Sequence, residues 1–219
     1  MKYVKMLSLA ALAATALMAL VGVGTASATK GVACSVNVGG GACTSKWAVP
    51  TTLDFSLTPG TSAILETTGG SELVTCSTAT VKGNLTDAGS STTTATGSNT
   101  EITWGTVATP CTFASTTVKL GKLKIEAEDN SGNGILYADE DIEVTVHVPG
   151  FLGGPCLYRV PNGRRIGTWD ESLQEFTANA VADRITTNHP CVFGGATNLW
   201  TATYIKTTPS NTTLYIATS

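Results

Sequence analysis

Apolar and polar side chains alternate along most of the chain, with the period of two residues that predicts β-strands. The segment 122–128, KLKIEAE, places leucine, isoleucine and alanine on one face and lysines and glutamates on the other. The segment 141–148, DIEVTVHV, repeats the pattern with one isoleucine and three valines on its apolar face. Turn-forming residues such as Pro59 and Gly60 separate these segments from further short ones of the same kind. The pattern therefore predicts a chain of many short strands.

One segment is ambiguous between helix and strand. Residues 171–185, ESLQEFTANAVADRI, carry apolar side chains at loosely helical spacing, but residues 176–182 also alternate, which favours a strand. Residues 86–98 are low in complexity and predict an exposed loop or a ragged edge. Ten or more short strands without intervening helices predict an all-β fold, which we interpret as a single-domain antiparallel β-sandwich.

The first 28 residues have the three parts of a secretory signal peptide. Two lysines precede an apolar run from Leu7 to Gly24, and the sequence ASA at 26–28 offers the small residues that signal peptidase requires. An uncleaved membrane anchor is the alternative, but small residues dominate the run. We therefore expect a signal peptide at 1–28, a secreted extracellular domain at 29–219, and no membrane span after cleavage.

The charge balance argues against two classes of partner. The chain has 13 basic and 16 acidic residues, and loss of the two leader lysines leaves 11 basic residues and a formal net charge of −5. Nucleic acids and anionic membranes select clustered Lys and Arg, so we expect neither as a partner. The sequence identifies no partner, and a component of the cell envelope and a glycan are the candidates that we retain.

All six cysteines lie beyond the predicted leader, and an even number in a secreted chain predicts three disulfides among 15 possible connectivities. Two pairs share the same spacing of 35 positions, and the second cysteine of each pair follows a proline. This regularity favours three pairs and suggests an internal two-fold repeat of a disulfide-closed unit. Coincidental spacing is the alternative. The predicted pairs are Cys34–Cys43, Cys76–Cys111 and Cys156–Cys191.

The segment 128–140, EDNSGNGILYADE, offers most of the oxygen ligands of a calcium-binding EF-hand loop. Asp129, Ser131 and Asn133 would be the first ligands and Glu140 the bidentate twelfth. An EF-hand needs helices on both sides, however, whereas the preceding segment alternates as a strand. Asn and Gly also suit a plain hairpin turn, which is the interpretation that we favour, so no metal or other cofactor is expected and calcium is the alternative.

Motifs for catalysis are weak. The sequence has no Gly-x-Ser-x-Gly or His-Glu-x-x-His motif, and the cysteines are assigned to disulfides. His147 is predicted on the outward face of a strand and His189 in a turn, and neither suggests a catalytic triad. Carboxylate pairs among Asp139, Asp141 and Glu143 would need the geometry of a glycosidase. We expect no catalytic residue.

Four tryptophans are candidates for stacking on sugar rings. Trp104 and Trp200 lie in apolar alternation and are predicted to belong to the core. Trp169 follows a turn and neighbours Arg164 and Asp170, so it is the tryptophan most expected at the surface. Even for Trp169, a packed aromatic side chain is favoured over a platform for a ligand.

Four stretches resemble a family of small secreted actinobacterial proteins. They are MKYVKMLSLAALAATALMAL at the start, TPGTSAILETTGG at 58–70, LVTCSTATVKG at 73–83 and LWTATYIKTTPSNTTLYIA at 199–217. Members share a signal peptide, two spaced cysteine pairs and a final Trp-Thr-Ala-x-Tyr strand, and the similarity covers nearly the whole chain. The resemblance implies export and disulfides, but no activity and no site residue. We therefore expect a secreted, non-enzymatic protein with a binding or structural role, the alternatives being a calcium- or carbohydrate-binding module and a secreted hydrolase.

Overall fold

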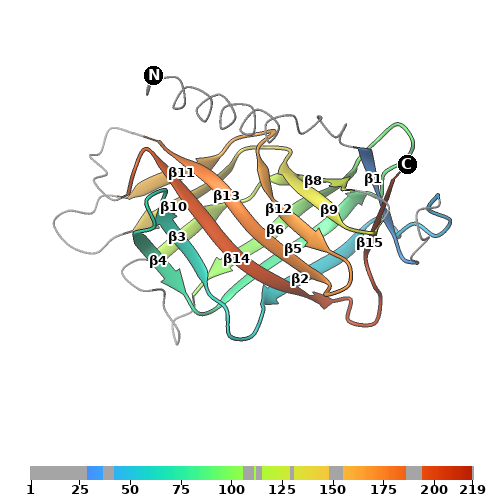
Figure 1. Ribbon diagram of the computed structural model, residues 1–219, viewed down its shortest axis with the longest axis horizontal. Coiled ribbons are helices and arrows are strands. Elements are labelled where there is room, and N and C mark those ends of the chain that lie inside the picture. Colours follow the sequence, from blue (N-terminus) through green and yellow to red (C-terminus); the bar gives the residue numbers. More distant parts are fainter. Residues whose placement is uncertain are drawn as a thin grey trace, which may run out of the picture.

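The computed structural model describes residues 29–36, 42–105, 111, 115–128, 131–147, 155–185 and 194–218, and within them every regular element is a strand (Figure 1). The all-β prediction is confirmed. The strands are β1 (Thr29–Cys34), β2 (Thr51–Leu57), β3 (Ala63–Thr67), β4 (Glu72–Cys76), β5 (Ala79–Asp87), β6 (Ala95–Trp104), β7 (Ser115–Lys119), β8 (Lys122–Ala127), β9 (Gly134–Ala138), β10 (Ile142–His147), β11 (Cys156–Val160), β12 (Arg165–Asp170), β13 (Glu175–Ile185), β14 (Thr197–Thr208) and β15 (Tyr215–Thr218).

The sheet closes on itself, so the predicted sandwich is wrong. Strands β14, β2, β5, β6, β8, β9, β12 and β13 are neighbours in that order, and β13 pairs again with β14. All of these pairings are antiparallel, which makes an eight-stranded closed barrel. A period of two residues tells only which side of a strand is buried, and that side is the same in a sandwich and in a barrel.

The barrel is elongated because its longest strands have different partners along their length. β14 pairs with β3 through its first half, residues 198–201, and with β2 through its second half, residues 204–208. β13 similarly pairs with β12 near its start and with β11 near its end. Strands β3–β4 and β11–β10–β7 therefore extend the closed part at one end, as Figure 1 shows on the left.

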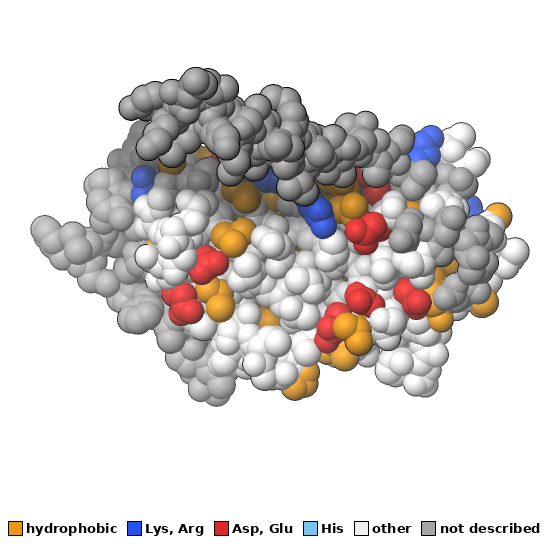
Figure 2. Space-filling view, viewed as in Figure 1, with side chains coloured by type: hydrophobic (Ala, Val, Ile, Leu, Met, Phe, Trp, Pro, Cys, Tyr) orange, Lys and Arg blue, Asp and Glu red, His pale blue; other side chains and the backbone are white. Residues whose placement is uncertain are grey.

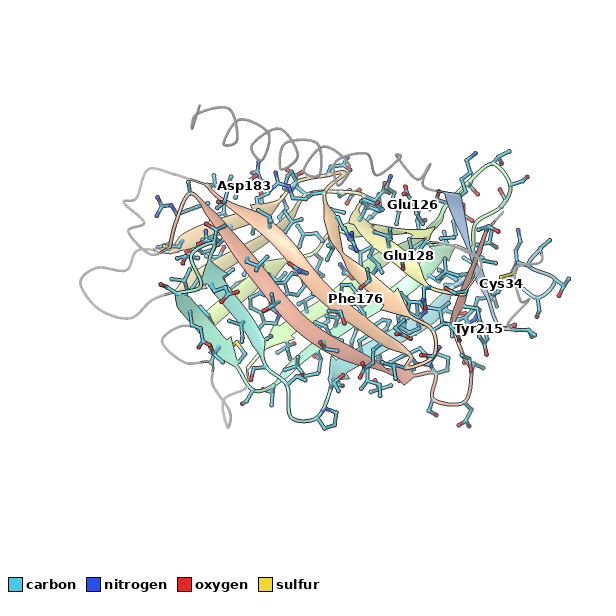
Figure 3. The ribbon with its side chains drawn as sticks, viewed as in Figure 1. Cys34, Glu126, Glu128, Phe176, Asp183 and Tyr215 are labelled. Carbon is cyan, nitrogen blue, oxygen red and sulfur yellow. A yellow bond between two sulfur atoms is a disulfide. The ribbon has the colours of Figure 1, made fainter. Side chains whose placement is uncertain are left out.

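The opposite end of the barrel is covered by the paired strands β1 and β15. Gly31 to Cys34 pair with Tyr215 to Thr218, and the start of β1 also pairs with β8. A Cβ atom at Gly31 would lie only 2.4 Å from the carbonyl oxygen of Ile125, so glycine permits this close crossing over β8. We call these two strands the end cap. Cys34 and Tyr215 mark it on the right in Figure 3.

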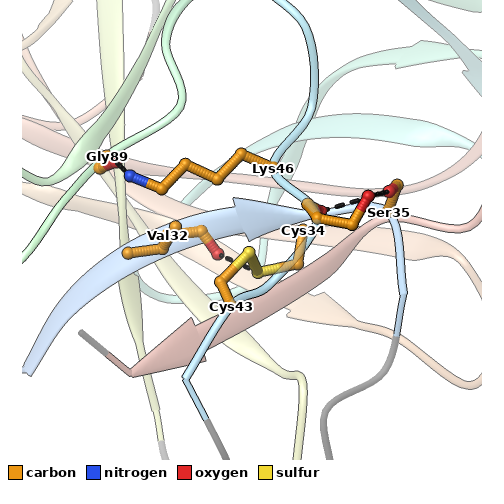
Figure 4. The surroundings of a disulfide bond; sticks show 7 residues. Val32, Cys34, Ser35, Cys43, Lys46 and Gly89 are labelled. Carbon is orange, nitrogen blue, oxygen red and sulfur yellow. Dashed lines mark hydrogen bonds between the residues drawn. A yellow bond between two sulfur atoms is a disulfide. The ribbon is translucent and has the colours of Figure 1, made fainter.

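Two of the predicted disulfides are confirmed. Cys34 bonds Cys43 beside the end cap, and Cys76 bonds Cys111. Next to the first bridge, Lys46 Nζ donates a 2.7 Å hydrogen bond to the carbonyl oxygen of Gly89, which ties the cap region to the β5–β6 loop (Figure 4). The third predicted pair, Cys156–Cys191, involves a residue outside the described ranges.

The two segments of 35 positions do not repeat one unit. The described part of residues 76–111 contains two strands, β5 and β6, whereas that of residues 156–191 contains three, β11 to β13. Cys76 ends a strand, whereas Cys156 begins one. Equal spacing predicted one of these disulfides without reflecting a duplicated architecture.

The two uncertain segments prove more regular than the sequence suggested. Residues 175–185 form strand β13, with Phe176 and three alanines buried in alternation, which confirms the strand prediction. The segment 86–98 is only partly a loop, because β5 continues to Asp87 and β6 already begins at Ala95. Threonine-rich sequence suits a strand as well as a loop when the neighbouring strands supply the hydrogen bonds.

Removing the long disulfide should destabilise the protein more than removing the short one. The Cys76–Cys111 bridge spans 35 positions and Cys34–Cys43 spans 9. On the chain-entropy model these loops correspond to about 3.8 and about 2.6 kcal/mol. Urea unfolding of Cys76→Ala/Cys111→Ala and of Cys34→Ala/Cys43→Ala measures both losses. A larger loss for the short bridge would contradict this ranking.

Candidate ligand cavity

The closed part of the barrel contains an apolar cavity of about 100 Å³, which we call the main cavity. Every barrel strand except β14 contributes to its wall, and the end cap adds Ala33 and Ile216. The alternation along each strand explains the arrangement, since every second side chain points inward. Apolar side chains that line the cavity include Leu53, Phe55, Leu85, Ile125, Leu136 and Trp169.

Several polar residues of the wall use their polar atoms elsewhere. Lys124 forms a 3.2 Å ion pair with Glu126, and its ammonium also lies 5.4 Å from the centre of the Tyr137 ring. The side-chain oxygen of Asn84 accepts a 3.0 Å hydrogen bond from the Thr52 hydroxyl at an exposed position. The surface that these residues present to the cavity is therefore almost entirely carbon.

Trp169, the tryptophan most expected at the surface, is a packed and buried side chain, which is the interpretation favoured over a ligand platform. Only 2% of its surface is accessible, and its indole N–H donates a 3.1 Å hydrogen bond to the carbonyl oxygen of Leu214. Phe55 packs against it edge to face, with ring centres 6.2 Å apart. Gln174 binds the same segment, because its side-chain oxygen accepts from the Leu214 N–H at 2.8 Å. These bonds hold the entry to β15 against the cavity wall.

A smaller cavity of about 40 Å³ lies beside an aromatic cluster further along the barrel. Trp104 and Trp200, predicted for the core, are each 8% exposed, with ring centres 5.3 Å apart. Phe176 and Tyr204 stack at 6.1 Å, and Phe176 lines both cavities near the middle of the long axis (Figure 3). Burial raises the pKa of Tyr204, which therefore stays neutral.

The polar groups of this cluster lack conventional hydrogen-bond partners among the described residues. They are the indole N–H groups of Trp104 and Trp200 and the hydroxyl of Tyr204. The Trp104 indole N–H lies close enough to the Tyr204 hydroxyl to offset part of the rise in the Tyr204 pKa. The two groups do not meet the geometry of an ordinary hydrogen bond. Tilted ring pairs let such groups face the π-electrons of a neighbour, which is a weaker interaction.

The predicted calcium ligands are not brought together by the described part of the chain. Asn133 and Glu140 lie at opposite ends of β9, and five strand residues separate them by roughly 17 Å. The Asn133 side-chain oxygen accepts from the Glu171 N–H at 2.9 Å, and Glu140 pairs with Lys122. Ser131 accepts a bond from the Asn133 N–H, whereas Asp129 lies outside the described residues.

The β8–β9 pairing makes the predicted hairpin, with Ala127 opposite Gly134. Over the described ranges, no group of three or more His, Cys, Asp or Glu side chains is arranged to hold a metal ion.

The acidic cluster near Asp141 belongs to an ion-pair network on the outer face. Arg159 contacts Asp141 at 3.4 Å and Glu143 at 2.6 Å, and Lys119 adds a 3.3 Å bond to Glu143. Burial alone would raise the pKa of Glu143, but the bonds from Arg159 and Lys119 outweigh it and lower the pKa. These carboxylates stabilise the sheet through ion pairs with side chains of the neighbouring strands.

The exposed face is polar apart from small apolar groups. On the described part of the face in Figure 2, hydrophobic side chains appear in small separate groups among polar and acidic ones. His147 is exposed at the end of β10, as predicted, whereas His189 lies outside the described residues. The described chain contains no apolar helix of membrane-spanning length.

Comparisons with protein-family models, with curated proteins and with solved structures each found no match. Sequence reasoning missed the main cavity, because alternation marks inward-facing residues without showing how well they fill the interior. The one available signal was the number of small residues on inward faces, such as Ala33 and Ala95.

Replacing Glu143 with glutamine should lower stability in a pH-dependent way. The pKa of Glu143 is lower in the folded state than its ordinary value of 4.5, so its contribution is present above that pH and is lost as pH falls through the folded pKa. We expect Glu143→Gln to cost about 1–3 kcal/mol at pH 7, with the difference shrinking as the pH falls below 4.5. Urea unfolding across this pH range measures the difference in stability.

The exposed Glu101→Gln is the control, and its stability should change little. A pH-independent difference for Glu143→Gln would contradict the assignment.

Proposed function

We propose that this protein is exported and acts as a non-enzymatic binding protein that holds its ligand inside the barrel. The apolar main cavity inside the barrel is the observation that carries the proposal. Binding sites in proteins are typically concave, largely preformed and mostly apolar, which describes this cavity. A closed sheet also keeps such an interior apart from water without exposing an unpaired strand edge.

Export is supported by the leader-like first 28 residues and by two disulfides. Disulfides persist in oxidising environments outside the cytosol. We therefore place the protein in the extracellular space or the cell envelope.

Binding is favoured over catalysis by the chemistry of the cavity wall. General acid–base and nucleophilic catalysis both need a polar side chain within hydrogen-bond reach of the reacting atom. The surface of the cavity wall is almost entirely carbon. Arg159 is paired with Glu143 on the outer face of the sheet, and the Lys124 ammonium is engaged by Glu126. A ligand held there would be kept and released unchanged.

The alternative binding sites have less support. A tryptophan that stacks on a sugar ring must be exposed, and Trp169 is instead committed to Leu214 and Phe55. The calcium alternative would have to bring Asn133 and Glu140 together from the two ends of β9. The barrel interior is therefore the site that we propose.

Filling the main cavity should abolish retention of the natural ligand. Leu85 lines the cavity and is 5% exposed, so Leu85→Phe would place a ring in the space that the ligand needs. We expect the unaltered protein, incubated with an organic extract of the producing culture and then gel-filtered, to release a bound small molecule that mass spectrometry detects. Leu85→Phe should release little of it.

Leu73→Phe is the matched control, because Leu73 is 7% exposed and lines neither cavity. It should retain the molecule wherever the variant remains folded. Equal retention by the unaltered protein and by Leu85→Phe, or no retained molecule at all, would contradict binding in the barrel interior.

A further inference from the structure

We propose that the main cavity takes a compact, neutral, hydrocarbon-like molecule of about one ring. This inference rests on the proposed binding function and specifies its ligand class. Three properties of the cavity carry it: its size, the nearly all-carbon surface that the described residues present to it, and the aromatic rings in its wall.

The size excludes large ligands. The cavity has a volume of about 100 Å³. An apolar cavity of about 150 Å³ in another protein stays dry and binds benzene or xenon. A ring of five or six heavy atoms is therefore near the upper limit, and a long acyl chain or a polycyclic molecule would need the wall to move.

The cavity surface is almost entirely carbon, and two of the polar groups around it are already engaged. The Trp169 indole N–H is bonded to the carbonyl oxygen of Leu214, and the Lys124 ammonium is paired with Glu126. A polar ligand would lose its bonds to water without replacing them, and a charged ligand would also lose its hydration. The cavity therefore selects neutral and apolar molecules.

Aromatic rings favour a flat ring over a chain of the same size. Phe55 and Trp169 meet at 81° in the wall, and Phe176 lines the same cavity from β13. Edge-to-face and offset contacts between rings are more favourable than area burial alone. A flat ring can make such contacts with these side chains, whereas a linear chain makes only dispersion contacts.

The small cavity offers a limited extension. The residues that line both cavities are Val81, Asn99, Leu123 and Phe176. A rotation of the Phe176 ring would therefore lengthen the available space toward Trp104 and Trp200. This direction suits a single short substituent on the ring. Elsewhere in the wall, Ala33 and Ile216 of the end cap line the main cavity.

Benzene, cyclohexane and benzoate are the probes that test the ligand class. Near saturation, benzene should raise the Tm of the full chain by several degrees, because binding to the folded state alone stabilises it. Benzene should also shift the NMR methyl signals of Leu53, Leu85 and Ile125. Cyclohexane should bind more weakly than benzene, and benzoate at least 100-fold more weakly.

Two substitutions of Leu85 locate the site. Leu85→Ala enlarges the main cavity and should admit toluene or indene better than the unaltered protein does, whereas Leu73→Ala, a matched buried truncation, should not. If Leu85→Ala does not fold, Leu85→Phe still tests the site. Leu85→Phe should stay folded and lose benzene binding, so its Tm should be the same with and without benzene.

The outcomes separate this inference from the proposed function. A culture-derived ligand that is charged, rich in hydrogen-bonding groups or larger than one ring would overturn the ligand class and leave barrel binding standing. Benzene binding that shifts the methyl signals without any retained natural molecule would support the cavity chemistry and overturn the function. A benzene response unchanged in Leu85→Phe, or matched by benzoate, would overturn the inference.

Discussion

Hydrogen bonding of β14 on both of its edges is the interaction on which the rest of this structure depends. One edge pairs with β13 over residues 197–205, and the other pairs with β3 and then β2. Without these pairings the sheet would have two exposed edges and an open apolar face. Because β14 closes the ring, the alternating side chains of every barrel strand share one interior. The core, the end cap and the cavities all lie in or against that interior.

The interior combines large and small side chains, and this mixture explains why it is incompletely filled. The half with Trp104, Trp200 and Tyr204 packs large rings together and keeps a cavity of only about 40 Å³. The capped half places Ala33 and Ala95 among its wall residues and keeps about 100 Å³. Voids of this size reduce stability by roughly 24 cal/mol per Å³, or about 2 kcal/mol for the larger one. A bound molecule would restore the lost contacts.

Local pattern allowed much of the fold and little of the site to be anticipated. The alternation in 122–128 predicted strand β8, and equal spacing predicted the Cys76–Cys111 bridge. Closure was not predictable, because the pairing of β14 with β2 joins residues about 150 positions apart and leaves no local signal. The surroundings of Trp169 were not predictable for a related reason. Its charged neighbours suggested exposure, but its environment is set by Phe55 and Leu214, both distant in sequence.

The position of β14 along the chain also affects the order in which the protein folds. The hairpins β5–β6, β8–β9 and β12–β13 join strands close in sequence and can form as soon as their residues are available. The ring itself must wait for residues 197–208, so β2 remains without one of its partners until most of the chain has been made. Such long-range closure is slow, and early cysteine bridges would hold the waiting strands near their native places. The last step of barrel assembly is therefore the pairing of β14 with β13 and β2. A nascent chain interrupted before β14 would carry an open strand edge that is prone to aggregation.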